Sequence, residues 1–366
     1  MPLHFVKDNV NIDFIGKRRF GYVASVVLIL IALCSVLFGN GMRLGIDFAG
    51  GVIAQVKFEQ PVADEVLKKS MERPDLPGLS TQRFGLDNTD FLLRFSQQEG
   101  LTTVQLRDRI EVALKEAFPD NAASIERMEV VGPKVGKDLT EKGLSALFYA
   151  ILIIAVYISG RFEQRWMTAA IMAACLFGAT YVIGLVGVST FWLICACMAV
   201  TIIVCFVLRL NFALGAIVCL LHDVCIAVGV LSLMDIDVDL NVLAAILTII
   251  GYSLNDTIIV YDRLRENLRL NPDKELGFLI NRSINQTLAR TVLTSGTTLA
   301  AALALVILGG GVIYSFALTM TVGVIIGTYS SIFVATPLLL ALGNTEFYVR
   351  ANQKVEYEKP GEHGIV

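Results

Sequence analysis

The stretch Leu240–Tyr261 reads LNVLAAILTIIGYSLNDTIIVY, an almost unbroken apolar run with one ionisable residue, Asp256. A helix needs about 20 apolar residues to cross the roughly 30 Å hydrocarbon core of a bilayer, and this run is long enough. A carboxylate inside such a helix is costly, so its presence there indicates a function. The stretch therefore predicts a membrane-spanning helix that carries a functional acid.

The composition of the whole chain agrees with this prediction. Of the 366 residues, 55% are apolar and 17% are charged, whereas globular chains have about 45–50% and 25%. The net charge of −3 provides no basic surface for nucleic acid. All seven cysteines lie in apolar stretches, so no disulfide framework, metal site or cofactor is expected. The composition predicts an α-helical, polytopic membrane protein in contact with lipid.

Seven further apolar runs surround Leu240–Tyr261, which makes about eight predicted membrane helices in all. The first run follows Lys17-Arg18-Arg19 like a signal peptide, but it is too long for one and no cleavage site follows. The last run is long enough to tilt strongly or to kink at Pro337. The seven runs are Phe20–Gly39, Gly143–Gly160, Trp166–Val188, Phe191–Leu208, Phe212–Met234, Ile284–Gly310 and Val312–Leu342.

Basic residues of the short loops predict the orientation, because they concentrate on the cytoplasmic side. With the amino terminus inside, these residues all face the cytoplasm: Lys17, Arg18, Arg19, Arg161, Arg165, Arg209, Arg263, Arg265, Arg269, Lys274, Arg282, Arg350 and Lys354. The outer short loops, Ser189-Thr190, Asp235–Asp239 and Gly309–Gly311, contain no lysine or arginine. Both termini are therefore predicted to be cytoplasmic.

This topology predicts seven segments. They are a cytoplasmic tail (1–19), a first helix (20–39), an extracytoplasmic domain (40–142), a second helix (143–160), a hairpin (166–208), a helical core (212–342) and a second cytoplasmic tail (343–366).

The polar segment 40–142 has the pattern of one small α+β domain. Gly51–Glu59 and Ile125–Val131 alternate like strands, and Thr81–Leu86 and Phe91–Phe95 flank a turn-forming stretch. Val62–Glu72 and Thr102–Phe118 have helical spacing. The order strand–helix–strand–strand–helix–strand predicts a ferredoxin-like domain. The segment has no histidine and no cysteine, and it shows no catalytic constellation.

Asp256 and Arg290 are the candidate proton-responsive residues. Asp256 shares a helical stripe with Tyr252 and Asn255, and Arg290 shares one with Thr294 and Thr298. The predicted topology places both charges in the cytoplasmic half of the membrane, so they can form a pair that makes each tolerable in lipid. A static ion pair, or an arginine that reaches the headgroups, is the structural alternative.

His222 and Asp223 add a second ionisable position within a predicted membrane helix. Neighbours on a helix point about 100° apart, so we expect the two side chains to face different ways. A functional role for His222 and a structural hydrogen bond are both open.

Two glycine-rich junctions flank the polar domain. Gly45-Ile-Asp47-Phe-Ala-Gly50-Gly51 follows the first membrane helix, and Val131-Gly132-Pro133-Lys-Val-Gly136 precedes the second. Both are candidate hinges, because glycine permits backbone conformations that other residues do not. A phosphate-binding loop is excluded, since we expect no helix closely after either junction and neither contains GK[ST].

Taken together, these motifs resemble the SecD/SecF family of bacterial protein-export membrane proteins, and specifically its SecF subunits. The resemblance rests on the two glycine junctions, on His222-Asp223, on Gly251–Thr257 with the following YDRLREN, and on Asn281–Thr298. It implies a resistance-nodulation-division-like fold in the bacterial inner membrane. The implied partners are SecD, the SecYEG channel and the unfolded preprotein, whose export the proton-motive force promotes. It also assigns the family's proton-responsive aspartate and arginine to Asp256 and Arg290.

The chain departs from the family in its helix count, because SecF resembles a six-helix protein. Arg161-Phe162-Glu163 and Arg209–Ile217 both resemble the cytoplasmic turn after the family's second helix. The hairpin 166–208 between them therefore resembles an insertion, and it leaves every later loop on its original side.

Two other function classes remain as alternatives. An intramembrane aspartyl protease would use Asp223 and Asp256, but the glycine that such enzymes place shortly before the second aspartate is missing. A stand-alone proton-coupled transporter of the same superfamily would need more than one six-helix half.

Overall fold

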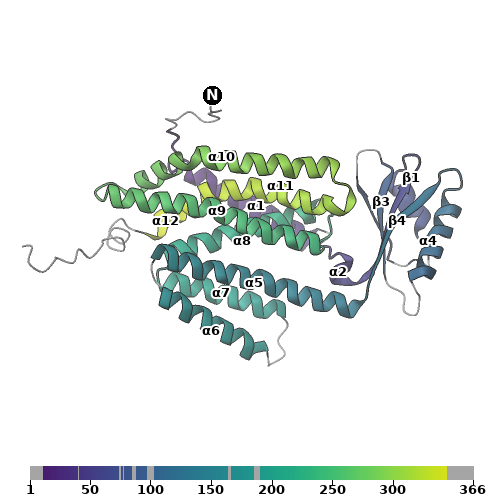
Figure 1. Cartoon of the computed structure of the whole chain (residues 1–366), viewed down its shortest axis with the longest axis horizontal. Helices are drawn as coiled ribbons and strands as arrows, with labels where there is room; N and C mark the ends of the chain where they lie inside the picture. The colour runs from purple at the N-terminus through teal and green to yellow at the C-terminus, as the bar shows by residue number, and fades with distance from the viewer. Residues whose placement is uncertain are drawn as a thin grey trace, which may run out of the picture.

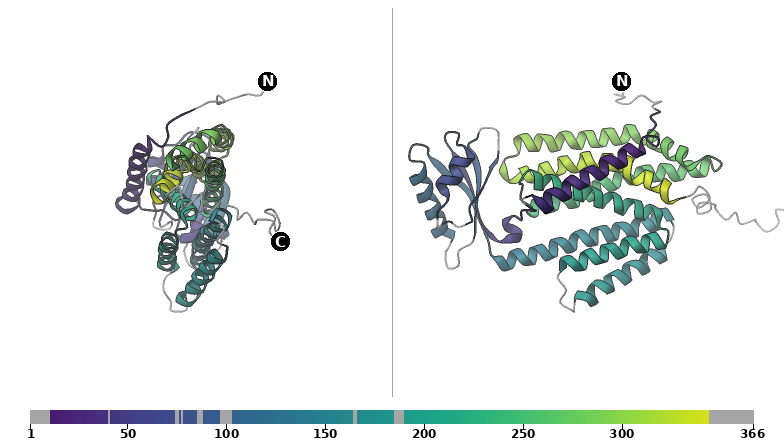
Figure 2. Two further views of the ribbon diagram at one scale, coloured as in Figure 1. Left: turned by 90° about the vertical axis from the view of Figure 1, so that its left-hand side faces the viewer. Right: turned by 180° about the vertical axis from the view of Figure 1, so that it is seen from behind.

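A bundle of long helices with a small sheet across one end makes up the computed structural model of the chain (Figure 1). The structure describes residues 11–39, 41–73, 76, 78–84, 88–96, 103–163, 166–184 and 190–343. The first residue of α1 and the last residue of α12 lie at the end of the bundle that is remote from the sheet (Figure 2).

Within the described residues, six helical segments are long and apolar enough to cross a membrane. They are Arg18–Phe38 (α1), Pro133–Phe162 within α5 (Pro133–Glu163), Asn211–Leu233 (α8), Leu240–Leu270 (α9), Leu276–Leu308 (α10) and Ile313–Leu342, which comprises most of α11 (Gly311–Ser330) together with η1 (Ser331–Ala335) and α12 (Thr336–Leu342). The predicted hairpin forms α6 (Trp166–Gly184) and α7 (Thr190–Val207), whose continuous apolar helices are shorter. The two further membrane crossings predicted for the hairpin stay a prediction.

Several helices extend beyond the apolar runs that predicted them. α5 begins ten residues before Gly143, α9 continues past Tyr261, and α10 begins at Leu276 instead of near Ile284. These extensions are polar, so hydropathy alone does not report them. The last helix is interrupted by the π-helical turn η1, directly before Pro337 in the first turn of α12. Proline cannot donate a backbone hydrogen bond, and this is the break that its position predicted.

The polar segment folds into the predicted order of strands and helices. Its elements are β1 (Gly51–Phe58), α3 (Asp64–Met71), β2 (Ser80–Phe84), β3 (Asp90–Phe95), α4 (Thr103–Ala117) and β4 (Ala123–Val131), preceded by the short helix α2 (Ile46–Ala49). The strands form one antiparallel sheet in the order β2-β3-β1-β4, the order of a ferredoxin-like fold. The predicted turn at Asp87–Asp90 lies partly outside the described residues.

Alternation along the strands gives the sheet two different faces. Val52, Val56 and Phe91 point to a core that α3 and α4 complete with Leu67 and Ile110. The opposite face carries Ile53, Gln55, Leu92 and Arg94 and is turned toward the helix bundle (Figure 1). The sheet therefore stands between its own helices and the membrane helices.

The helix bundle is held by close packing around α8. Phe162 of α5, Phe212 of α8 and Tyr261 of α9 form an aromatic cluster with ring centroids 5.1–5.7 Å apart. α1 lies along the outside of the bundle against α8 (Figure 2). A Cβ at Gly229 of α8 would lie 2.1 Å from that of Ala32, so glycine is required for this approach.

Candidate functional site

Asp256 lies buried where α9, α10 and α11 meet. Its side chain is 1% exposed, and its Oδ2 accepts a hydrogen bond from the Ser295 hydroxyl at 3.2 Å. Thr328 of α11 donates to Ser295 at 2.7 Å. The carboxylate is thus connected through two hydroxyls to all three helices, and a change in its charge would be felt by each of them.

Arg290 lies near enough to Asp256 for the two charges to interact, but the side chains do not form a direct ion pair. Arg290 is exposed on α10. Within the described residues, no ion pair of 4 Å or less joins it to Asp256. Helical spacing placed both residues at similar depth, but it did not resolve that Ser295, rather than Arg290, presents its side chain to Asp256. The arginine instead faces outward from this chain.

The other residues of the two predicted stripes divide between the inside and the outside of the bundle. Asn255 is exposed, whereas Tyr252, Thr294 and Thr298 are half-buried. Thr294 donates to carbonyls of its own helix, and the buried Tyr252 hydroxyl has no hydrogen-bond partner in the described part of the chain. The stripes therefore do not face each other as a closed path but border an outward-facing surface.

His222 and Asp223 contact each other, and beyond this contact they reach different helices, His222 toward α1 and Asp223 toward α9 and α11. His222 Nδ1 lies 2.9 Å from Asp223 Oδ1, and both side chains are buried. Rotation of the side chains about their own bonds closes the gap that the helical angle predicts. Three other helices contribute hydroxyls to the pair, namely Ser25 of α1, Ser253 of α9 and Ser330 at the end of α11. The Tyr329 hydroxyl contacts Ser25 in turn.

The two glycine junctions pack against each other. Gly50 and Gly51 have φ values of 76° and 138°, and a Cβ at Gly51 would lie 2.8 Å from the Phe95 carbonyl oxygen. A Cβ at Gly136 would lie 2.7 Å from the carbonyl oxygen of Phe48. The glycines are thus required for close approach, and their role as hinges stays a prediction.

The expectation that no helix closely follows these junctions is wrong for the second junction, whereas the first is followed by strand β1. α2 lies inside the first junction, and α5 begins at Pro133, directly after Gly132. Proline is favoured at the first position of a helix, since its missing N–H is not needed there. The absence of GK[ST] still argues against a phosphate loop.

A charged contact between the sheet and the helix bundle was missed by the sequence reasoning. Arg94 of β3 pairs with Asp237 in the loop between α8 and α9, and Arg43 Nε contacts Asp237 Oδ1 at 3.1 Å. The same loop pairs its Val238 with Leu44 in a parallel bridge. The three aspartates in the loop between α8 and α9 were the available signal, but their partners lie far away in the sequence.

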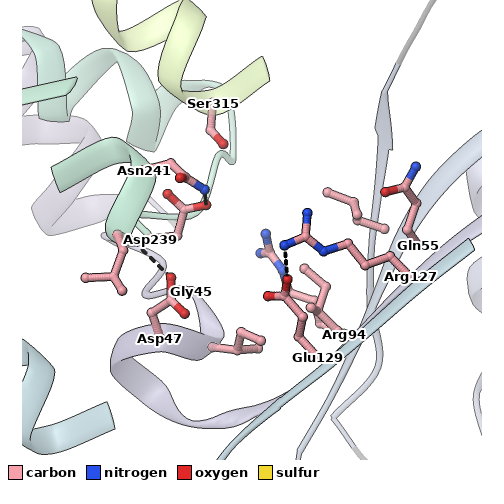
Figure 3. A pocket seen from close by; sticks show the side chains of 13 residues that line it. Gly45, Asp47, Gln55, Arg94, Arg127, Glu129, Asp239, Asn241 and Ser315 are labelled. Atoms are coloured by element: carbon pink, nitrogen blue, oxygen red, sulfur yellow. Dashed lines mark hydrogen bonds and ion pairs between the residues drawn. The ribbon is translucent and has the colours of Figure 1, made fainter. Parts of the chain in front are cut away.

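Asp47 and Asp239 both accept hydrogen bonds from backbone N–H groups at the start of α9. Asp47 Oδ2 accepts from the Leu240 N–H at 3.0 Å, and Asp239 Oδ1 accepts from the Val242 N–H at 2.8 Å. Two carboxylates therefore cap this helix, where its dipole favours negative charge. They line a cavity of about 240 Å³ between the sheet and the bundle, together with Arg94 and the Arg127–Glu129 pair (Figure 3).

Burial shifts the protonation equilibria of this junction. It lowers the pKa of Arg94 to about 10, with a further contribution from the nearby charge of Arg43. Burial also raises the pKa of Asp239, which the hydrogen bond from Val242 opposes. Both shifts show that charges are held here in surroundings that are poorer in water than the surface. No cluster of three or more histidine, cysteine, aspartate or glutamate side chains that could hold a metal occurs among the described residues.

Comparison with known proteins gives a consistent result over nearly the whole chain. The family "Protein export membrane protein SecD/SecF, C-terminal" matches residues 109–192 and 184–345, and the "SecD/SecF GG Motif" family matches residues 35–62. The second family covers the first glycine junction. The two overlapping matches of the first family meet within the predicted hairpin.

Curated relatives share between a third and two fifths of their residues with the chain. "Protein translocase subunit SecF" of Calditerrivibrio nitroreducens is 36% identical over 339 residues, covering 92% of this chain and 96% of the relative. The protein of the same name from Desulfurispirillum indicum is 38% identical over 356 residues and covers 96% and 97%. That from Rickettsia prowazekii is 34% identical and covers 97% of each chain.

Two solved structures share the fold. The crystal structure of SecDF, a translocon-associated membrane protein from Thermus thermophilus, matches with a TM-score of 0.66 at 30% identity over 92% of this chain. A SecDF in a super-membrane-facing form matches with a TM-score of 0.53 over 91%. The chain spans 39% of the length of each of these SecDF chains.

Proposed function

The chain belongs to the SecD/SecF family of protein export membrane proteins, and from this premise we propose that it is the SecF subunit of a Sec export complex. In this proposal it works with SecD beside the SecYEG channel in the bacterial inner membrane and uses the proton-motive force to promote export of unfolded preproteins. The observation that carries the proposal is the buried acid Asp256 beside an outward-facing polar surface.

That surface supports a partner subunit. Thr248, Gly251 and Asn255 of α9 and Arg290 and Thr297 of α10 are all exposed. A Cβ at Gly251 or at Gly296 would meet nothing within 4 Å. Polar groups are costly against lipid, whereas small and polar residues are typical of helix–helix contacts in membranes. We therefore assign this surface, which we call the α9–α10 face, to the contact with SecD.

Arg290 gives that contact a charge requirement. It faces outward and has no carboxylate of its own chain within 4 Å among the described residues. A charged side chain within a membrane protein is normally paired or faces a hydrated cavity. The partner surface should accordingly supply an acid opposite Arg290, close to Asp256.

The proposed mechanism starts with proton binding to Asp256. A neutral carboxyl group can donate as well as accept, so its contact with Ser295, and through it with Thr328, is rearranged. Because these residues belong to α9, α10 and α11, the rearrangement shifts the packing of three helices. α9 begins at the cap that Asp47 and Asp239 form, directly beneath the sheet. A shift of α9 therefore acts on the junction that carries the outer domain.

The available energy is sufficient for a substantial shift. One charge crossing 100 mV is worth about 2.3 kcal/mol, so a proton crossing roughly 150–200 mV supplies about 3–5 kcal/mol. Moving a two-state equilibrium from 1:99 to 99:1 takes about 5.5 kcal/mol. One proton can thus strongly bias the position of the outer domain, although preprotein binding or a second proton would have to complete the change.

Basic residues support the proposed orientation. α1 begins, and α5 and α9 end, at the end of the bundle remote from the sheet (Figure 1). These parts of the helices contain Arg18, Arg161, Arg263 and Arg265, so this end corresponds to the cytoplasm under the positive-inside rule. Both termini are then cytoplasmic and the ferredoxin-like domain lies outside. A non-catalytic role is supported by the separation of the two intramembrane acids, since Asp223 and Asp256 bind different sets of hydroxyls instead of sharing a site.

The test is export of a secreted reporter from cells depleted of their own SecF. The wild-type chain should restore export, and an uncoupler of the proton-motive force should abolish the restored part. Asp256→Asn should assemble with SecD but restore no uncoupler-sensitive export. Asp273→Asn, which removes an exposed acid from the loop after α9, is the matched control and should behave as wild type. Equal rescue by Asp256→Asn would reduce Asp256 to a structural residue.

A further inference from the structure

A second ionisable centre lies between α1, α8, α9 and α11, apart from Asp256. We propose that His222 and Asp223 together form a proton-binding site that holds one proton inside the membrane and controls the packing of α9 against α11. This inference adds a second site to the proposed function, and its test does not require export.

The carboxylate of Asp223 is surrounded by donors. Oδ1 faces His222 Nδ1 at 2.9 Å, while Oδ2 accepts from Ser253 at 2.5 Å and from Ser330 at 2.9 Å. The side chain is 1% exposed. Three hydrogen-bond partners on two oxygens can stabilise a buried carboxylate where water is absent.

The hydrogen bonds on the other side of His222 determine the number of protons. The Tyr329 hydroxyl donates its single hydrogen to the Gly21 carbonyl at 2.6 Å. In the 3.1 Å contact between Ser25 and Tyr329, the hydrogen must therefore come from Ser25. Ser25 can then only accept in its 3.1 Å contact with His222 Nε2, so this nitrogen carries a hydrogen.

Both ring nitrogens of His222 therefore carry hydrogens if Asp223 is ionised. If the proton between Nδ1 and Oδ1 lies on Asp223 instead, Nδ1 accepts a hydrogen bond from the carboxyl group. The number of protons on the His222–Asp223 pair is the same in both cases. In either case the pair as a unit holds one proton more than a neutral imidazole beside a carboxylate. Loss of that proton would leave one hydrogen bond of the chain unmade and a net negative charge in the bundle interior.

The surroundings of the pair contain few other ionisable groups. Cys219 of α8 donates to Ser330 at 3.1 Å, Tyr329 comes from α11, and Asp256 lies one turn beyond Ser253 on α9. α1 contributes the hydroxyl of Ser25. The described parts of α5, α7, α12 and η1 contribute no charged contact to the pair. Protonation of the pair is thus coupled mainly to hydroxyls and, through α9, to Asp256.

The bonds of Asp223 explain why the proton would matter to neighbouring helices. Ser253 and Ser330 belong to α9 and to the end of α11, and the π-helical turn η1 starts directly after Ser330. A Cβ at Gly327 would lie 3.0 Å from that of Ser253, so the two helices are in close contact there. π-helical turns occur frequently at functional sites. A change in the donors of Asp223 Oδ2 acts on this contact.

Nitrogen-15 NMR of a single-histidine chain tests the proposal directly. The chain has three histidines, and His4→Gln with His363→Gln leaves His222 as the only imidazole. In detergent micelles near pH 7, we expect the shifts of a ring with both nitrogens protonated or sharing a strong hydrogen bond with Asp223. A ring with one free, acceptor-type nitrogen over pH 5–9 would overturn the proposal.

Tyr329→Phe separates proton holding from a static hydrogen bond. Without the tyrosine oxygen, the Ser25 hydroxyl is free to donate to His222 Nε2. The singly protonated ring is then stabilised relative to the doubly protonated ring. The ratio of doubly to singly protonated imidazole at a fixed pH should fall about tenfold, the effect of one hydrogen bond to a charged group. Tyr261→Phe is the matched control, since its buried hydroxyl also donates to a backbone carbonyl, that of Ala335 at 3.4 Å. An equal effect of both variants would contradict the proposal.

Export assays distinguish this inference from the proposed function. If the proton-holding pair acts on α9, Tyr329→Phe should shift the pH dependence of reporter export in inverted membrane vesicles, while Tyr261→Phe should not. Loss of export in Asp256→Asn with a normal pH profile in Tyr329→Phe would support the proposed function and overturn the coupling. A doubly protonated His222 in a chain that does not support export would overturn the proposed function alone.

Discussion

Asp223 and Asp256 are two equally buried carboxylates that the chain treats in opposite ways. Each side chain is 1% exposed. Asp223 has three hydrogen-bond partners in its own chain, whereas the described residues offer Asp256 the single hydroxyl of Ser295. Asp223 lies in the middle of the bundle, and Asp256 lies beside the polar α9–α10 face. Equally buried carboxylates thus differ in their number of hydrogen bonds. The carboxylate with fewer hydrogen bonds, Asp256, lies beside the α9–α10 face that we propose contacts SecD.

The largest expected effect is a loss of stability on removing the satisfied acid. Asp223→Ala leaves His222, Ser253 and Ser330 without their shared acceptor, and breaking such a buried pair costs roughly 3–5 kcal/mol. Denaturant unfolding of the purified chain in micelles should show this cost. Asp256→Asn should change stability by less than about 1 kcal/mol, since an amide oxygen still accepts from Ser295. Similar losses in both variants would abolish the contrast.

Two glycines extend the same contrast from charge to packing. Gly229→Ala places a methyl group 2.1 Å from the Ala32 Cβ and should cost about 1–3 kcal/mol in the isolated chain. Gly296→Ala meets nothing within 4 Å, so it should be neutral or stabilise the isolated chain by up to about 1 kcal/mol. Thermal unfolding of each purified variant measures the difference.

The same Gly296→Ala variant should lose yield in co-purification with SecD if the α9–α10 face is the contact surface. The added methyl group then enters a helix–helix contact that depends on small residues. Ala301→Gly, on an exposed part of the same helix, changes helix propensity in the opposite sense and serves as a control. Unchanged recovery of SecD with Gly296→Ala would place the contact elsewhere.

Much of the architecture follows from local patterns. Apolar runs predicted the long helices, and alternation predicted the strands of the small sheet in the correct order, because both signals come from residues close in sequence. Polar extensions of the helices, such as the start of α5 at Pro133, were not predicted, because hydropathy detects only the apolar part of a helix. The break before Pro337 was predicted, because proline acts through its own covalent structure.

The candidate site was predicted in its residues but not in its contacts. Asp256, His222 and Asp223 were identified because ionisable groups in apolar runs are conspicuous. Which side chain meets which depends on rotation about side-chain bonds and on hydroxyl residues from other helices. Ser295 in place of Arg290, and the His222–Asp223 contact, are both of this kind. The Arg94–Asp237 pair joins residues too distant in sequence for any local pattern to indicate.

The smallest expected effect concerns the junction, where Asp239 is partly satisfied by its own helix. Its pKa is raised by burial, so the folded state binds the proton more tightly than the unfolded chain does. Stability therefore increases as the pH falls through the folded pKa, and the cost of the buried charge is present at higher pH.

Asp239→Asn keeps a good helix cap for Val242 but cannot titrate. Unfolding measured between pH 4 and 8 should show a shallower rise toward acid in this variant, with a difference below about 1 kcal/mol. Asp235→Asn, in the same loop, is the control. An identical pH dependence of wild type and Asp239→Asn would mean that this carboxylate is ionised at no net cost, and the contrast between satisfied and unsatisfied acids would then be confined to the membrane.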